Sequence, residues 1–308
     1  MRMTNIANYL LILLPGTVWG ASFIVTRLIL PYLPPFTIAV VRSAISAVFL
    51  FVTLTYLGGK LPRERREWGH VLILSLANMS AFVLTAWGQL YISGGLTTIL
   101  AATIPFFTII VAHATTDDDK INLAKSIGIV MGLIGVVILV GVEALQGISQ
   151  GLIGQLAVLV ASFLYGVGGV YARPVMARQP KSDSAWIPRL RVLTMQFIMS
   201  SLYVLPFSLL LDQPWTLTVP PEVFGYLLFL GIGVTSLATF VYYYLIQAMG
   251  ATISSMTMYM IPISGVILGV LILGEQISWT MPIALVLILG GVFVINRPFR
   301  AKGAKVTA

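Results

Sequence analysis

Residues 19–27 read WGASFIVTR, and residues 165–173 read YGVGGVYAR. In both stretches an aromatic residue followed by glycine precedes an arginine by the same interval. Further matches recur along the chain at a nearly constant, slightly longer offset: Gly94 with Gly250, Ile104-Pro105 with Ile261-Pro262, and Gly135-Val136 with Gly291-Val292. One such match means little in a chain rich in glycine and aliphatic residues, but several at one offset indicate an internal repeat.

The composition places most of the chain in lipid. Of its 308 residues, 58% are hydrophobic and only 9% are charged, and the mean hydropathy is +0.98. An ordinary soluble domain has about 25% charged residues, and one globular core cannot hide this much apolar surface. The composition therefore excludes a soluble enzyme, a disordered chain, a collagen and a nucleic-acid-binding module.

The apolar runs predict ten transmembrane helices, because a helix needs about 20 apolar residues to cross the hydrocarbon core. The expected spans are 7–30, 36–57, 69–92, 94–113, 122–141, 151–172, 188–211, 222–247, 251–273 and 280–296. Lys and Arg gather in the second–third and sixth–seventh loops and in the tail, whereas the fifth–sixth, seventh–eighth and ninth–tenth loops contain none. This positive-inside pattern accounts for the net charge of +8 and places both termini in the cytoplasm.

Each half of the repeat holds five expected spans, an odd number, so the second copy must enter the membrane from the opposite side. We therefore expect an all-α integral membrane protein built from two inverted five-helix repeats. The first repeat covers residues 1–146, the second covers residues 147–298, and residues 299–308 form a basic cytoplasmic tail. Inverted repeats give secondary transporters two alternately open ends around a site near the membrane midplane.

The chain resembles the EamA-type branch of the drug/metabolite transporter superfamily over roughly residues 7 to 296. The resemblance rests on Trp-Gly-Ala-Ser-Phe in the first span, a central proline in the fourth and ninth spans, and Gly274-Glu275-Gln276 before the last span. The first half departs from the family pattern, with Thr-Asp-Asp-Asp at residues 116–119 in place of the Gly-Glu step. The resemblance implies export or exchange of metabolites, often amino acids or nucleoside-like compounds, across the bacterial inner membrane.

Aromatic and polar residues inside the spans are the candidates for a substrate site, because polar groups in lipid are costly and face a cavity or a partner helix. Trp19, with Ser22 nearby, and its repeat mate Tyr165 face one cavity from opposite sides if the repeat axis passes through the site. The alternative for these residues is that they only fill space between helices.

A polar and aromatic stripe on the third span extends this candidate site. It contains Asn78, Phe82 and Trp87, and Tyr243 is the repeat mate of Trp87. Ring stacking and a few hydrogen bonds are what a small amphipathic ligand needs. The alternative is that these side chains bond neighbouring helices, for about 1 kcal/mol or less each.

Pro105 and Pro262 hold matching positions in the two halves, and each removes one helical hydrogen-bond donor. In lipid such a loss is tolerated only where the freed carbonyl lines a cavity or gains a partner. We therefore expect hinges or substrate-facing kinks rather than incidental prolines. Thr103 and Tyr259, which lie beside these breaks, are candidate substrate contacts.

Charged residues within the spans are few. Arg42 has no acidic neighbour one turn away, so it either clamps a substrate carboxylate or snorkels to the outer interface, and the sequence favours the interface. Glu275 and residues 117–119 lie at span ends and are expected to be solvated loop charges. No Asp or Glu lies centrally in any expected span, so the sequence offers no obvious proton site.

Other kinds of site lack the residues they need. The chain has no Cys and two distant His residues, which argues against a metal site, and it has no phosphate-binding loop for ATP. We expect no catalytic residue, no cofactor and no nucleic-acid partner; the partners are a small-molecule metabolite and the lipid bilayer. Gly128, Gly132 and Gly135 in the fifth span fit either a homodimer face or packing within a monomer.

These features predict a secondary transporter of the inner membrane, and not an enzyme. It would move small organic metabolites, such as amino acids or related amphipathic compounds, by alternating access, as an exporter, facilitator or exchanger. Two alternatives stay open. One is a proton-coupled multidrug or metabolite exporter, in which His113 is the candidate proton site. The other is a non-transporting membrane receptor or scaffold.

Overall fold

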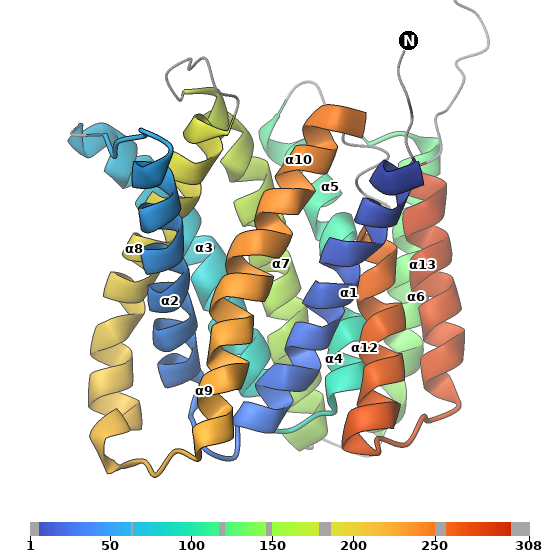
Figure 1. The fold of residues 1–308 in the computed structure, drawn as a ribbon. Coiled ribbons are helices and arrows are strands. Elements are labelled where there is room, and N and C mark those ends of the chain that lie inside the picture. Colours follow the sequence, from blue (N-terminus) through green and yellow to red (C-terminus); the bar gives the residue numbers. More distant parts are fainter. Residues whose placement is uncertain are drawn as a thin grey trace, which may run out of the picture.

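The computed structural model describes residues 6–62, 64–116, 121–145, 150–178, 186–249 and 257–296, and this part of the chain is a bundle of helices without strands (Figure 1). The α-helices are α1 (Ile6–Ile29), α2 (Pro35–Tyr56), α3 (Arg65–Gly88), α4 (Gly94–Ala101), α5 (Ile104–Thr115), α6 (Leu123–Leu145), α7 (Gln150–Ala177), α8 (Ile187–Phe207), α9 (Pro221–Leu228), α10 (Thr239–Met249), α12 (Thr257–Leu273) and α13 (Thr280–Asn296). The π-helical segments η1 (Ser208–Asp212) and η3 (Phe229–Ala238) extend α8 and join α9 to α10, and η2 (Pro214–Thr216) is a 3₁₀ turn.

The helices follow the expected spans to within a few residues, except in the fourth and eighth spans. Six helical segments of the described chain are long and apolar enough to cross a membrane, and four further apolar helices are shorter. The fourth span is broken, because α4 ends at Ala101 and α5 begins at Ile104. The eighth span runs through from α9 to α10, but its middle is π-helical over η3.

The two matched prolines have different local structures. Pro105 stands in the first turn of α5, where a missing N–H costs little, and the hydroxyl of Thr103 donates to the carbonyl of Leu100 at 2.6 Å within the break. Pro262 lies inside α12, which is uninterrupted over its described length. The break in the helix therefore occurs at Pro105 and not at Pro262, and the hinge or kink expected at each proline stays a prediction.

The helices pack in pairs that take one member from each half of the chain. Equivalent contacts occur in the two halves. Helix α1 packs on α12, and its mate α7 packs on α4 and α5. Helix α2 packs on η3, and its mate α8 packs on α3. Helix pairs α2 with α8, α6 with α13 and α4 with α12 each join a helix to its own repeat mate, and α3 packs extensively on α7 of the other half. Such reciprocal pairing is what two five-helix units related by a two-fold axis produce.

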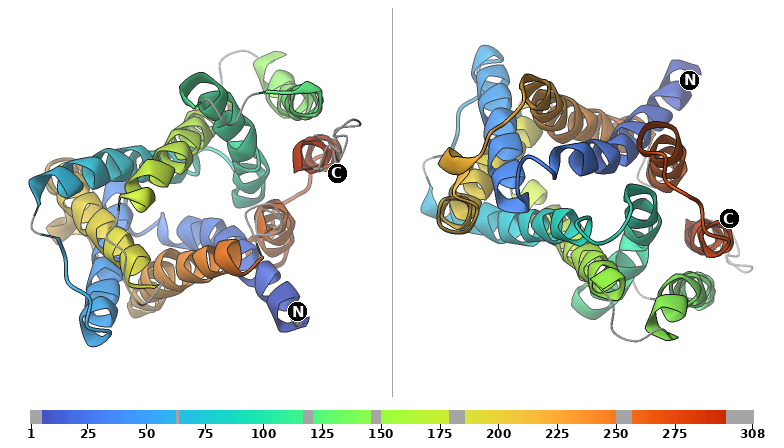
Figure 2. Two further views of the ribbon diagram at one scale, coloured as in Figure 1. Left: turned by 90° about the horizontal axis from the view of Figure 1, so that it is seen from above. Right: turned by 90° about the horizontal axis from the view of Figure 1, so that it is seen from below.

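The matched helices of the two halves run in opposite directions. In Figure 1, α1 begins at the top of the bundle, where α7 ends. The end of α13 lies at the same top face as the start of α1, the face that we expect to meet the cytoplasm. Seen along the bundle axis, α6 and α13 lie on one side of the bundle, beyond α5 and α12 (Figure 2).

The bundle is apolar both outside and inside. Large aliphatic side chains cover the outside, with Val48 65%, Val137 66% and Val286 71% exposed, as contact with lipid requires. Four buried clusters fill the inside of the described bundle, and two of them are larger than the others. The first core cluster joins α1, α2, α3, α8, α9 and η3 and includes Phe82, and the second core cluster joins α4, α5, α6, α7 and α13.

The glycines of α6 serve packing within the chain. A Cβ atom added to Gly128 would lie 2.4 Å from the carbonyl oxygen of Gly291 on α13, and one added to Gly132 would lie 2.0 Å from the ring of Phe106. Glycine therefore lets α6 approach α13 and α5 closely, and this face of α6 is occupied without a second copy of the chain.

Candidate functional site

Three of the expected site residues come together inside the bundle. Trp19 of α1, Phe82 of α3 and Tyr165 of α7 all belong to or pack on the first core cluster. The ring of Trp19 also meets that of Tyr242 on α10 edge to face, with 5.2 Å between the ring centroids. We call Trp19, Phe82, Tyr165 and Tyr242 the central aromatic group. It contains both members of one repeat pair, Trp19 and Tyr165.

Arg42 of α2 points into this group. Its Nε and Nη2 atoms donate to the hydroxyl oxygen of Thr235 at 2.9 and 2.8 Å, and its guanidinium lies 4.2 Å from the centroid of the Phe82 ring. It also interacts electrostatically with Tyr165. The expectation that Arg42 snorkels to the outer interface is therefore wrong, because a hydroxyl and an aromatic face hold the cation inside the bundle.

Two further expected residues adjoin the central aromatic group. The hydroxyl of Ser22 donates to the carbonyl of Trp19 at 2.6 Å, so it is satisfied within α1. Asn78 of α3 lies against Gly168 of α7, where an added Cβ would be only 2.3 Å from Asn78 Oδ1. The glycine thus makes room for a half-buried amide between the two helices.

The other expected residues lie elsewhere. Trp87 meets Tyr91 near the end of α3, with ring centroids 5.0 Å apart. Thr103 is buried in the break between α4 and α5, and Tyr259 packs on the second core cluster. The side chain of Tyr243 lies outside the described residues. The contacts of Trp87, Thr103 and Tyr259 described here are therefore with other residues than the central aromatic group, and their role in a substrate site stays a prediction.

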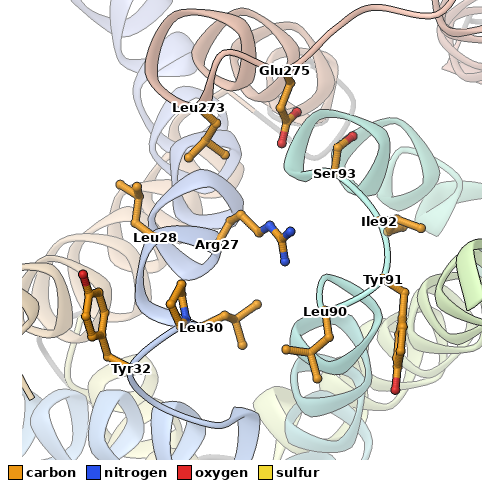
Figure 3. Close-up of a pocket in the computed structure, with 11 residues that line it drawn as sticks. Arg27, Leu28, Leu30, Tyr32, Leu90, Tyr91, Ile92, Ser93, Leu273 and Glu275 are labelled. Carbon is orange, nitrogen blue, oxygen red and sulfur yellow. The ribbon is translucent and has the colours of Figure 1, made fainter. Parts of the chain in front are cut away.

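A pocket of about 660 Å³ opens at the end of the bundle where α1 finishes. Figure 3 shows the guanidinium of Arg27 pointing into it, with Glu275 on the facing wall. Arg27 also donates to the carbonyl of Gln89. The lining residues are Arg27, Leu28, Leu30, Pro31, Tyr32, Leu90, Tyr91, Ile92, Ser93, Leu273 and Glu275.

Glu275 is a helix cap and not a solvated loop charge, which corrects the expectation from its place at a span end. Its two carboxylate oxygens accept hydrogen bonds from the backbone N–H groups of Gly94 and Gly95 at 2.6 and 2.8 Å, at the N-terminus of α4. Gly274 has a φ of +64°, which turns the chain after α12 and suits glycine. The Gly-Glu step therefore ties the end of α12 to the start of α4.

Sequence reasoning missed the pocket and the partners of Arg42. Both charged residues of the pocket lie in sequence motifs that could have pointed to it. Arg27 ends the repeated stretch that begins at Trp19, and Glu275 belongs to the Gly-Glu step. Thr235, the hydrogen-bond partner of Arg42, carried no signal that distinguished it from other hydroxyls in the spans. Among the residues that the structure describes, no group of three or more His, Cys, Asp or Glu side chains is placed to hold a metal ion.

Comparison with known proteins agrees with this architecture. A model of the EamA-like transporter family matches the chain twice, at residues 6–141 and 152–297. The Bacillus subtilis protein called uncharacterized transporter YoaV is 25% identical over 278 residues, which cover 90% of this chain and 92% of that protein. The Escherichia coli K12 protein called uncharacterized inner membrane transporter YedA is 25% identical over 283 residues, covering 91% and 87%.

One solved crystal structure shares the fold, with a TM-score of 0.65 at 17% identity, covering 94% of this chain and 96% of the other. Fold and sequence together define a multi-pass helical membrane protein built from two related halves. The chain belongs to the EamA-like transporter family, and it is a membrane transporter.

Proposed function

We propose that the protein is a secondary transporter that moves small organic metabolites, such as amino acids or related amphipathic compounds, across the inner membrane by alternating access. The observation that carries this proposal is the central aromatic group with Arg42, which lies where helices of both halves meet. A cluster of rings with one cation suits a small molecule that has an apolar part and a polar end.

The reciprocal helix pairing supports alternating access. Matched helices of the two halves make corresponding contacts and run in opposite directions. If the two halves swap conformations, an inward-open form therefore becomes an outward-open form. The pocket beside Arg27 and Glu275 lies at one end of this bundle. We place this end on the outer side, because the Lys- and Arg-rich loops lie at the other end.

The proposed driving force is the gradient of the substrate itself, or exchange for a second substrate. In the part of the chain that the structure describes, the carboxylates Asp212, Glu222 and Glu275 lie at helix ends. Proton-driven carriers commonly use a carboxylate within the membrane, so this distribution favours a facilitator or exchanger.

The test is counterflow into proteoliposomes loaded with unlabelled pools of amino acids, nucleosides or sugars, with and without an imposed pH gradient. We expect saturable uptake of at least one labelled amino acid that does not depend on the gradient. Protein-free liposomes provide the background. Uptake only with the gradient would support the proton-coupled exporter instead, and no uptake from any pool would favour a receptor or scaffold.

A further inference from the structure

We infer that Arg42 binds a carboxylate group of the transported molecule, so that the substrates are organic acids or zwitterions with an apolar or aromatic body. The inference rests on the proposed transport function and adds the chemical class of the substrate. Three observations carry it. The charge of Arg42 has no counter-ion among the described residues, polar contacts with η3 hold its guanidinium in place, and aromatic rings lie beside it.

The charge of Arg42 has no counter-ion among the described residues. No described carboxylate lies within 4.0 Å of its guanidinium, and its recorded partners are the Thr235 hydroxyl, the Phe82 ring and Tyr165. Asp212, a carboxylate that contacts the same helix, instead accepts hydrogen bonds from the backbone N–H and the hydroxyl of Thr37 at 2.7 and 2.9 Å. An uncompensated arginine within a membrane-spanning helix is costly, so an anionic ligand there would be strongly favoured.

The guanidinium also keeps donors available. Arginine has five N–H donors in a fork that matches a carboxylate. Only Nε and Nη2 donate to protein in the described residues, and both donate to the same oxygen of Thr235. Arg42 is half-buried, and its Nη1 atom makes no hydrogen bond to a described residue, so this nitrogen remains available as a donor to a ligand. A bidentate pair between this fork and a carboxylate supplies both energy and orientation.

The backbone around Thr235 is built to hold Arg42 in place. Thr235 lies in the π-helical segment η3, and its hydroxyl donates to the carbonyl of Leu230 at 2.7 Å. A Cβ added to Gly231 would lie 2.5 Å from Ile45 and 3.1 Å from the carbonyl oxygen of Arg42, so glycine permits the close approach of η3 to α2. π-Helical insertions within α-helices are frequent at functional sites.

A second polar contact fixes the same pair of segments. The hydroxyls of Ser46 and Ser236 lie 2.8 Å apart; Ser46 is one helical turn after Arg42, and Ser236 directly follows Thr235. Two adjacent polar contacts therefore fix the register between α2 and η3 beside the guanidinium. With the Phe82 ring on its face, Arg42 is pre-oriented, which lowers the entropic cost of binding a ligand.

The test compares purified wild-type protein with Arg42→Gln, Arg42→Lys and Arg65→Gln. Arg65 is an exposed arginine at the start of α3 and serves as the matched control. The probes are phenylacetate, its uncharged analogue phenylacetamide, and phenyl phosphate, and the readout is the dissociation constant from titration calorimetry in detergent. Thermal unfolding verifies that each variant is folded.

In the wild type and in Arg65→Gln, we expect phenylacetate to bind at least about tenfold more tightly than phenylacetamide. Arg42→Gln should abolish that preference, because it weakens phenylacetate binding about tenfold and phenylacetamide binding much less. Arg42→Lys, which keeps the charge but loses the planar fork, should retain part of the preference and tests the site even if Arg42→Gln does not fold.

Several outcomes would overturn the inference: an intact preference in Arg42→Gln, an equal loss of acid and amide binding in that folded variant, or a wild type without any preference for the acid. Tighter binding of phenyl phosphate than of phenylacetate would overturn the carboxylate assignment. Saturable counterflow combined with any of these results leaves the transport function standing. Arg42-dependent binding without flux from any pool would instead support the site and overturn transport.

Discussion

Trp19 and Tyr165 hold equivalent positions in the two halves and pack on the same buried cluster from α1 and α7. Each ring therefore forms part of the wall where the two halves meet. An aromatic ring there buries a large apolar area and orients an apolar ligand through its face and edge. The neighbouring Arg42 supplies the polar end of the same site.

We expect Trp19→Ala and Tyr165→Ala each to raise the KM for counterflow by about tenfold, since a ring contact is worth about 0.5–1.5 kcal/mol beyond its buried area. Trp19→Phe keeps a ring and should retain most of the affinity. Trp215→Ala removes a tryptophan that is 68% exposed and is the control. Wild-type flux in both alanine variants would contradict a paired aromatic site.

The cap that Glu275 forms on α4 depends on small neighbours. A Cβ added to Gly269 would lie 2.6 Å from the Glu275 carboxylate, whereas one added to Gly225 of α9 meets nothing within 4 Å. We expect Gly269→Ala to displace the carboxylate and cost about 1–2 kcal/mol of stability, as the loss of a charged helix cap does. Thermal unfolding should show a melting temperature lower by a few degrees. Equal melting temperatures for Gly269→Ala and Gly225→Ala would refute this role of the cap.

At the scale of elements, two membrane segments depart from regular α-helix. The fourth span is split between α4 and α5, and the eighth contains the π-helical segment η3. Both departures adjoin residues discussed above: Thr103 lies in the first, and Thr235, the partner of Arg42, lies in the second. A broken helix and a π-helical segment each free backbone groups and permit local rotation, which a rigid span does not.

We expect Pro105→Ala to slow transport, because alanine restores the donor that a continuous helix across α4 and α5 needs. A barrier higher by about 1 kcal/mol lowers the turnover rate about fivefold. Pro262→Ala should have a smaller effect, since α12 is already continuous. Unchanged counterflow kinetics in Pro105→Ala would show that the break is not a hinge.

At the scale of the whole molecule, the two halves are joined through pairs of matched helices rather than side by side as separate domains. Helices α2 and α8 form one such pair, and α6 and α13 form another. Helix α1 lies against α12, a helix of the other half. Movement of one half therefore repacks its contacts with the other, as alternating access requires.

Membrane orientation can be measured directly, because the chain contains no Cys. We expect Gln276→Cys, on the turn between α12 and α13, to react with an impermeant maleimide added to intact cells. Glu64→Cys, beside the basic loop before α3, should react only after permeabilisation. Both positions are exposed, so each is the control for the other. The reverse pattern would place the termini outside and contradict the positive-inside orientation.

Much of the architecture could be read from local sequence. The lengths of the apolar runs predicted most helix ends to within a few residues. The repeated Trp-Gly and Tyr-Gly stretches indicated two related halves. Of the candidate site residues, Trp19, Phe82 and Tyr165 belong to or pack on the first core cluster and Tyr259 packs on the second, and the substrate site itself stays a prediction. Matching repeat positions identify equivalent residues but not the face of the helix that meets the other half.

The sequence by itself determined the membrane-embedded helical class and the repeat, because hydropathy and motif spacing depend on residues near one another in the chain. Only the tertiary structure decided that Arg42 turns inward to Thr235, that Glu275 caps α4, and that Gly128 packs on α13. Each of these contacts joins residues far apart in sequence. These contacts form only when the helices have a particular rotation and a particular spacing. Apolar periodicity does not specify that rotation, because the lipid and the protein core are both apolar.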